Sequence, residues 1–267
     1  MSTPGFRSVA TEWGGATVRY DVREAPGASG IVFVPGWCCS RGDWFPMVES
    51  FEDFSSATLD LPGQGESASA RTDWTIPEFG EVVSALVGEL GWADVILVGH
   101  SMGGAVCVEA AALTAVKRVV CIDSLTYQEF YPRQSEESIA GVLDTIAADF
   151  RGTVTGVVNR YSVDRSDPVL RARIAEDLGR TSVPHALGSW RSLLEWDRDV
   201  QLGQVDVPIS VIAASAFLDS EVAASLSDRL DIVPVDLGGH FFLREDPRGT
   251  AAIVRNVAFA DSAVAPM

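Results

Sequence analysis

Residues 94–104 read DVILVGHSMGG, and this stretch governs how the rest of the chain is interpreted. Asp94–His100 is a short apolar run typical of a buried strand, and an Ala-rich helical pattern begins at Met102. Between them, Gly99–Gly103 forms a G-x-S-x-G motif. The chain must turn from strand to helix in almost no residues, which requires small neighbours and exposes Ser101 at the helix N-terminus. The stretch therefore predicts that Ser101 is a nucleophile.

Similar apolar runs rich in Val and Ile recur along the chain and predict further buried strands. These runs are Gly30–Pro35, Ser56–Leu61, Lys117–Asp123, Pro208–Ala214 and Asp231–Leu237. Helical patterns alternate with them, at Ile76–Leu90, Met102–Leu113 and Pro247–Ala260. The alternation predicts an α/β fold, with a largely parallel sheet covered by helices on both faces. Thr17–Glu24 alternates in polarity and is expected to add an edge strand.

The alternation of strands and helices breaks in the middle of the chain. Residues 127–200 contain no strand-like run, but helical patterns occur at Ser138–Phe150, Pro168–Leu178 and Pro184–Trp196. We therefore predict a core formed by residues 1–126 and 201–267, and a helical cap formed by residues 127–200.

Composition excludes several classes of partner. Among the 267 residues, 37 are acidic and 20 basic, giving a formal net charge of −17. No basic cluster is present to meet nucleic-acid phosphates or an anionic membrane. The sequence shows no apolar run long enough to span a membrane, and Met1–Tyr20 shows no signal-peptide pattern. The spacing of the four cysteines fits neither a zinc site nor a disulfide framework. We expect a cytoplasmic protein with a small-molecule substrate and no metal or cofactor; the oligomeric state is not indicated.

A serine nucleophile needs a base, and the chain has three histidines. His100 is adjacent to Ser101 on the strand, so the two side chains are expected to point apart. His185 lies in the helical insertion, where a surface or packing role is the plainer reading. His240 follows the last strand, after Gly238 and Gly239. Ser101 and His240 should therefore meet at the C-terminal edge of the sheet, and we predict that His240 is the base.

Taken together, GHSMG around Ser101, GGHF around His240 and DLPGQGES at Asp60–Ser67 resemble the α/β-hydrolase superfamily. The resemblance runs from about Thr17 to Ala260. It implies the α/β-hydrolase fold, with a mostly parallel eight-stranded sheet and a helical cap inserted after the sixth strand. It also implies that Asp60–Ser67 is mainly a structural turn.

The acid partner of His240 is ambiguous in the sequence. In the family it usually follows the seventh strand, which places it near Ala213–Ser215, where no carboxylate stands. Asp219 comes later, close to a predicted helix start, where its plainer role is a helix cap. Asp123 ends the preceding strand, a position that some family members, such as lactone hydrolases of the zearalenone type and cofactor-free quinolone dioxygenases, use for the acid. We favour Asp123 and keep Asp219 as the alternative.

The resemblance also implies an oxyanion hole, and aromatic residues in the insertion and beside His240 suggest a substrate pocket. The backbone amides of Trp37 and Met102 are the expected oxyanion donors, because the family places them after the third strand and after the nucleophile. Cys38 is a weak rival nucleophile without an obvious base. The predicted substrate pocket is lined by Trp37, His100, Tyr127, Trp190 and Phe241.

Two chemistries remain open at this point. The first is a serine hydrolase that cleaves a carboxylic ester or lactone of a fairly hydrophobic small molecule through an acyl-enzyme on Ser101. The second is a cofactor-independent dioxygenase of the same fold, in which the His240–Asp123 pair deprotonates the substrate and the serine is not acylated. A binding protein that has kept the fold is disfavoured by the complete Ser–His–Asp set.

Overall fold

The computed structural model of the protein describes residues 5–27, 29–131 and 133–259. Positions 1–4, 28, 132 and 260–267 lie outside the described residues, and with them both ends of the predicted core and Ala260, the predicted end of the last helix. Within the described chain, eight strands form one sheet, in the order β1-β2-β4-β3-β6-β7-β8-β9, and the two-residue β5 pairs with β2. The strands are β1 Arg7–Trp13, β2 Ala16–Arg23, β3 Ser29–Val34, β4 Ser55–Leu59, β5 Ala68–Ser69, β6 Asp94–His100, β7 Arg118–Ile122, β8 Ile209–Ala214 and β9 Asp231–Val235.

The predicted α/β-hydrolase sheet is confirmed, with one difference at its edge. The strands from β4 to β9 along the sheet pair in parallel, whereas β1–β2 and β2–β4 pair antiparallel. The predicted edge strand is β2, but β1 covers it and forms the edge instead. The β1 sequence RSVATEW is partly exposed along its length, so it carries no apolar run that would have marked it as a strand.

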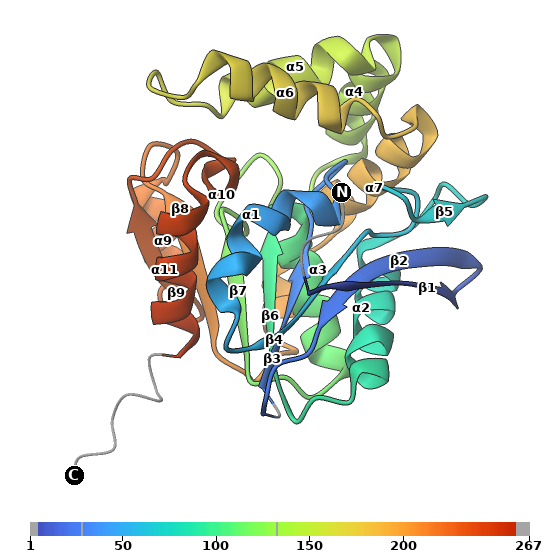
Figure 1. The fold of residues 1–267 in the computed structure, drawn as a ribbon. Coiled ribbons are helices and arrows are strands. Elements are labelled where there is room, and N and C mark those ends of the chain that lie inside the picture. The colour runs from blue at the N-terminus through green and yellow to red at the C-terminus, as the bar shows by residue number, and fades with distance from the viewer. Residues whose placement is uncertain (1–4, 28, 132, 260–267) are drawn as a thin grey trace.

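Helices cover both faces of this sheet (Figure 1). Residues of α2, α3 and α9 belong to the apolar core on one face, and residues of α1 and α11 belong to the core on the other. The helices and 3₁₀ turns of the core region are η1 Arg41–Trp44, α1 Phe45–Val48, η2 Glu49–Phe51, α2 Ile76–Leu90, α3 Met102–Leu113, α8 Arg198–Leu202, α9 Ser220–Leu226, α10 Phe242–Glu245 and α11 Pro247–Ala258.

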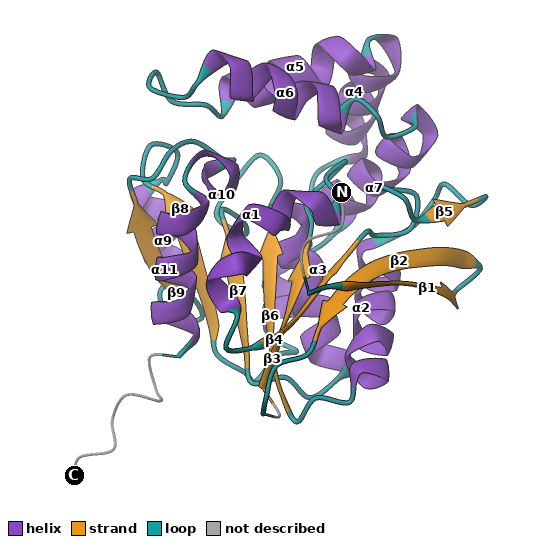
Figure 2. Ribbon diagram, in the orientation of Figure 1, coloured by secondary structure: helices purple, strands orange, loops and turns teal. Residues whose placement is uncertain are grey.

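Between β7 and β8, the described part of the chain contains helices and loops and no strand (Figure 2). This insertion follows the sixth strand when the two-residue β5 is left out of the count. Its helices α4, α5 and α6 lie beyond the C-terminal ends of the parallel strands (Figure 1). They are α4 Glu136–Ala148, α5 Phe150–Arg160, α6 Pro168–Leu178 and α7 Val183–Glu195. We retain residues 127–200 as the proposed cap.

The segment Asp60–Ser67 forms a buried turn after β4. The Asp60 carboxylate accepts hydrogen bonds from the backbone N–H groups of Arg41 (2.6 Å) and Glu66 (2.9 Å) and pairs with the Arg41 guanidinium. A Cβ at Gly65 would lie 2.3 Å from the Asp60 carboxyl carbon, so only glycine allows this approach. None of residues 60–67 is among those that line the cavity described below.

Candidate active site

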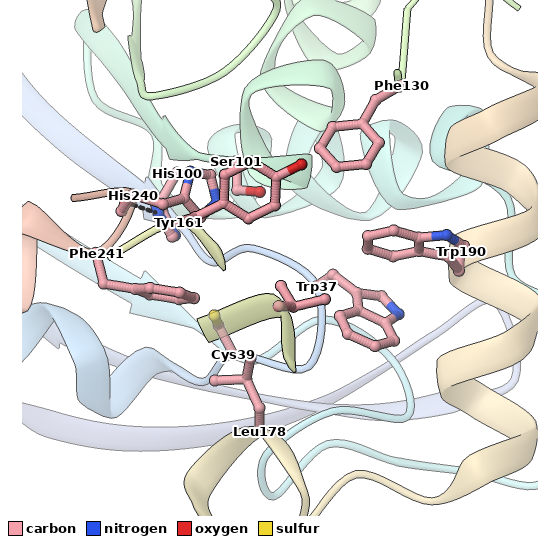
Figure 3. A pocket seen from close by; sticks show the side chains of 11 residues that line it. Trp37, Cys39, His100, Ser101, Phe130, Tyr161, Leu178, Trp190, His240 and Phe241 are labelled. Atoms are coloured by element: carbon pink, nitrogen blue, oxygen red, sulfur yellow. Dashed lines mark hydrogen bonds between the residues drawn. The ribbon is translucent and has the colours of Figure 1, made fainter. Parts of the chain in front are cut away.

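Ser101 occupies the strained turn between β6 and α3. Its backbone has φ 52° and ψ −122°, a conformation that residues other than glycine rarely adopt. The turn is possible because glycines stand two residues before and after Ser101. A Cβ at Gly99 would lie 2.2 Å from the Gly103 carbonyl oxygen, and one at Gly103 would lie 2.4 Å from the Val34 carbonyl oxygen. The Ser101 side chain lines a cavity between the core and the proposed cap (Figure 3).

His240 lies at the same cavity, in the loop after β9. Its backbone N–H donates to the Tyr161 carbonyl oxygen at 2.7 Å. A Cβ at Gly239 would lie 2.2 Å from that same oxygen, which explains why glycine precedes the histidine. The loop after α5 therefore holds the His240 loop in place.

Asp123 is the carboxylate that reaches His240. It follows β7, is 1% exposed, and lies 2.6 Å from His240 Nδ1 through Oδ2. The other oxygen, Oδ1, accepts from the Ala214 N–H at 2.7 Å, at the end of β8. Asp219, by contrast, is exposed and accepts from the backbone N–H groups of Glu221 (2.8 Å) and Val222 (3.2 Å) as the N-cap of α9.

Tyr127 was predicted to line the substrate pocket, but the structure places it elsewhere. It does not line the cavity with Ser101; its hydroxyl donates to the same Asp123 oxygen that faces His240. Burial, followed by the negative charge of Asp123, raises the pKa of the Tyr127 hydroxyl, so it remains a protonated donor. Contrary to the expectation, Tyr127 is not among the residues that line this cavity, and its buried hydroxyl finds its hydrogen-bond partner in Asp123.

The loop after β3 lies directly against the nucleophile turn. A Cβ at Gly36 would be 3.2 Å from Ser101 Cβ and 3.1 Å from His100 Nδ1, so glycine permits this approach. The next residue, Trp37, lines the cavity, and its indole N–H donates to the Ala186 carbonyl oxygen at 2.9 Å. Met102 is the first residue of α3, where a backbone N–H has no acceptor within the helix. The two predicted oxyanion donors thus lie on the two segments that flank Ser101.

His100 lies beside His240 and also lines the cavity, although we expected its side chain to point away from that of Ser101. Its Nε2 is 3.0 Å from the His240 carbonyl oxygen, so Nε2 carries the proton and donates (Figure 3). Burial, and then the charge of the His240 ring, hold the pKa of His100 well below its ordinary value. A neutral His100 therefore supports the His240 loop through this hydrogen bond.

The cavity at Ser101 has a volume of about 20 Å³, which is room for about one water molecule. Of the predicted pocket residues, Trp37, His100, Trp190 and Phe241 line it. The sequence reasoning missed Cys39, Phe130, Val157, Tyr161 and Leu178. Aromaticity was the available signal for Phe130 and Tyr161, but their meeting here depends on how the helices of the proposed cap pack.

Cys38 and Cys39 are buried beside this cavity. Burial raises the pKa of both thiols, so neither is a thiolate near neutral pH. Among the described residues, no cluster of His, Cys, Asp or Glu side chains is arranged to hold a metal ion. None of the helices described in the structure has the length and apolarity needed to cross a membrane.

Comparisons with known proteins show which family and fold this chain resembles. A sequence profile described as Alpha/beta hydrolase family matches residues 31–253. Lipase LipV of Mycobacterium tuberculosis is 26% identical over 241 residues, which are 80% of this chain and 87% of that protein. The dihydrolipoyllysine-residue acetyltransferase component of the acetoin cleaving system of Cupriavidus necator is 28% identical over 163 residues, 56% of this chain; the match spans only 42% of that longer protein.

Among solved structures, the enol-lactonase from Burkholderia xenovorans superimposes with a TM-score of 0.80, covering 95% of this chain and 100% of that one. The two sequences are 20% identical, so this likeness shows the fold alone. Because the profile covers most of the chain, the protein belongs to the α/β-hydrolase family.

Proposed function

We propose that this α/β hydrolase is a serine hydrolase that cleaves carboxylic esters or lactones of fairly hydrophobic small molecules. One observation carries the proposal: Ser101 and His240 line one cavity, and the Asp123 carboxylate lies 2.6 Å from His240 Nδ1. With Nδ1–H donating to Asp123, Nε2 of His240 is left as the base.

In the proposed first half-reaction, His240 takes the hydroxyl proton of Ser101 while the Ser101 oxygen attacks the substrate carbonyl carbon. The negative charge that develops on the carbonyl oxygen is stabilised by the amides of Trp37 and Met102 and by the N-terminus of α3. Asp123 stabilises the imidazolium that forms on His240. Collapse of the tetrahedral intermediate breaks the C–O bond, and His240 protonates the leaving alkoxide.

In the second half-reaction, His240 takes a proton from water, and the hydroxide attacks the acyl carbon bound to Ser101. The carboxylic acid is released and the Ser101 hydroxyl is restored. The apolar walls, which include Trp37, Trp190 and Phe241, favour substrates with apolar groups next to the reacting carbonyl. The lipase and enol-lactonase named above are consistent with this substrate class.

The cytoplasmic location is also a proposal. It is supported by four free, buried cysteines, which suit a reducing compartment.

The decisive experiment compares the wild type with Ser101→Ala on aryl esters of acetate, butyrate and octanoate, under air and under argon. We expect turnover that needs Ser101 and is independent of oxygen. A fluorophosphonate should add mass to the wild type and not to Ser101→Ala, and equal melting temperatures would show that the variant is folded. Full activity in Ser101→Ala, or turnover that stops under argon, would contradict the proposal; the latter would favour the dioxygenase chemistry of the His240–Asp123 pair.

A further inference from the structure

A second hollow lies next to the catalytic cavity and is much larger. Its volume is about 330 Å³, against about 20 Å³ for the cavity at Ser101. Pockets that bind small ligands usually measure about 300–1,000 Å³, so only the second hollow has room for a substrate chain. It is formed mainly by α4 and α5, which contribute Glu137, Ser138, Gly141, Val142, Thr145 and Ile146 from α4 and Thr153 and Val157 from α5.

The two hollows share a wall. Trp37, Val157 and Trp190 line both of them. Figure 3 shows Trp37 and Trp190 at the end of the catalytic cavity that lies away from Ser101 and His240. Their ring centroids are 4.4 Å apart, so these side chains separate the two spaces in this structure. A chain that continues from a carbonyl group at Ser101 into the larger hollow must therefore pass this shared wall.

The two tryptophans of this wall are held differently. The Trp37 indole N–H donates to the Ala186 carbonyl oxygen, which ties the ring to α7. The Trp190 indole nitrogen is buried and has no hydrogen-bond partner among the described residues. A rotation of Trp190 therefore breaks no hydrogen bond of its indole, whereas a rotation of Trp37 breaks one. Trp190 is the side of the wall that can yield to a substrate.

We propose that this α4–α5 groove binds an unbranched, uncharged alkyl chain of the substrate, whose ester or lactone carbonyl lies at Ser101. The proposal rests on the hydrolase function proposed above and specifies its substrate class. The groove floor is apolar, because Ile146, Trp37 and Trp190 are all at least nine-tenths buried. The exposed rim includes Glu137, whose carboxylate disfavours a chain that ends in an anionic group.

Gly141 offers a way to fill the groove without disturbing the fold. It lies on the α4 face that lines the groove, and no described residue outside its own stretch of helix has an atom within 4 Å of a Cβ built there. Gly156 is a matched control, because it is also an exposed glycine in a cap helix, has the same open space, and does not line the groove. A phenylalanine at either site improves helix propensity over glycine to the same extent.

The test measures kcat/KM for two ester series in the wild type, Gly141→Phe and Gly156→Phe. One series holds the aryl alcohol constant and lengthens the acyl chain from two to eight carbons; the other holds acetate constant and lengthens an n-alkyl alcohol. In one of them the wild type should gain roughly two- to fourfold per added methylene. Gly141→Phe should flatten that slope and Gly156→Phe should keep it. The series that responds identifies which half of the ester lies in the groove.

A binding measurement separates failure of the groove from failure of the proposed function. Decan-2-one is titrated into Ser101→Ala, Ser101→Ala/Gly141→Phe and Ser101→Ala/Gly156→Phe, with tryptophan fluorescence as the readout. Binding that Gly141→Phe weakens at least tenfold supports the groove even where no ester is hydrolysed, and only the hydrolase proposal then fails. Slopes and binding that Gly141→Phe leaves unchanged, or the absence of binding by Ser101→Ala, would overturn the groove proposal.

Discussion

Replacing Asp123 by Asn tests the proposed acid most directly, because the hydrogen bonds of this carboxylate are not equivalent. Oδ1 accepts from the Ala214 N–H at 2.7 Å, while Oδ2 faces His240 Nδ1 at 2.6 Å and accepts from the Tyr127 hydroxyl. An asparagine keeps one oxygen and gains an NH₂ group. With its oxygen at Ala214, the NH₂ group donates to His240 Nδ1, which moves the ring proton to Nε2 and removes the base.

The opposite orientation keeps the productive tautomer but sets the NH₂ group against the Ala214 N–H. Two facing donors without an acceptor cost about 1–3 kcal/mol. Losing the carboxylate charge removes a further 1.5–3 kcal/mol or so from the interaction with the imidazolium. Together the two effects amount to about 2.5–6 kcal/mol, or a fall in kcat/KM of roughly 10²- to 10⁴-fold. The same replacement in serine proteases with this arrangement costs about 10⁴-fold.

The assay is kcat/KM on an aryl ester for the wild type, Asp123→Asn and Asp219→Asn, with thermal melting to show that each variant is folded. Asp219→Asn is the matched control, because asparagine caps a helix about as well as aspartate and should leave activity within about twofold. If Asp123→Asn lost less than about tenfold, or Asp219→Asn lost more than Asp123→Asn, the role given to Asp123 would be refuted.

Three further predictions concern stability and reactivity. Gly103→Ala places a Cβ 2.4 Å from the Val34 carbonyl oxygen, so calorimetry should show a loss of about 1–3 kcal/mol in the free energy of unfolding. Gly88→Ala is the control and should not destabilise the protein, because no described residue outside its own helix lies within 4 Å of the added Cβ. Equal melting temperatures for the two variants would contradict this prediction. The folded-state pKa of His100 is depressed, so its contribution to stability is present above about pH 6.5 and is lost as the pH falls further. His100→Gln should therefore flatten the fall in melting temperature between pH 7 and pH 5; an unchanged slope would refute it. Burial raises the pKa of the Cys38 thiol, so a disulfide reagent at pH 8 should modify it slowly in the native protein and quickly in guanidinium, and fast native labelling would show that the thiol is accessible.

The sequence predicts most of the core because its signals are local. The strands from β3 to β9, apart from β5, follow short apolar runs. The nucleophile turn follows glycines at positions where its backbone geometry leaves no room for a side chain. The helix α5 was missed because FRGTVTGVVNR contains two glycines and several β-branched residues, which are poor helix formers. It forms because Val154 and Val158 are buried against its neighbours, and a tertiary contact of that kind leaves no local signal.

The site was predictable only in part for a related reason. Ser101 and His240 each stand in a distinctive local motif, whereas the two aspartates stand in none. The predicted helix start beside Asp219 favoured Asp123 as the acid without deciding the choice. Tyr127 is aromatic and lies in the insertion, so the sequence placed it in the pocket; its hydroxyl instead donates to Asp123. The chain between the two residues has positive φ at Leu125, a conformation that the sequence preference of leucine does not predict.

The sheet register explains how a carboxylate after β7 can take a place that the family usually fills after β8. The two strands pair in parallel with Ile122 beside Ile212, and the Asp123 N–H donates to the Ile212 carbonyl oxygen at 2.7 Å. The positive φ of Asp123 (48°) then turns its side chain toward the end of β8, where the Ala214 N–H anchors Oδ1. One strand thus supplies the carboxylate and its neighbour supplies the amide that orients it. Because parallel strands end at a common edge, the acid can shift by one strand without moving the histidine, so the pairing of strands, and not the position of a motif, decides which aspartate meets His240.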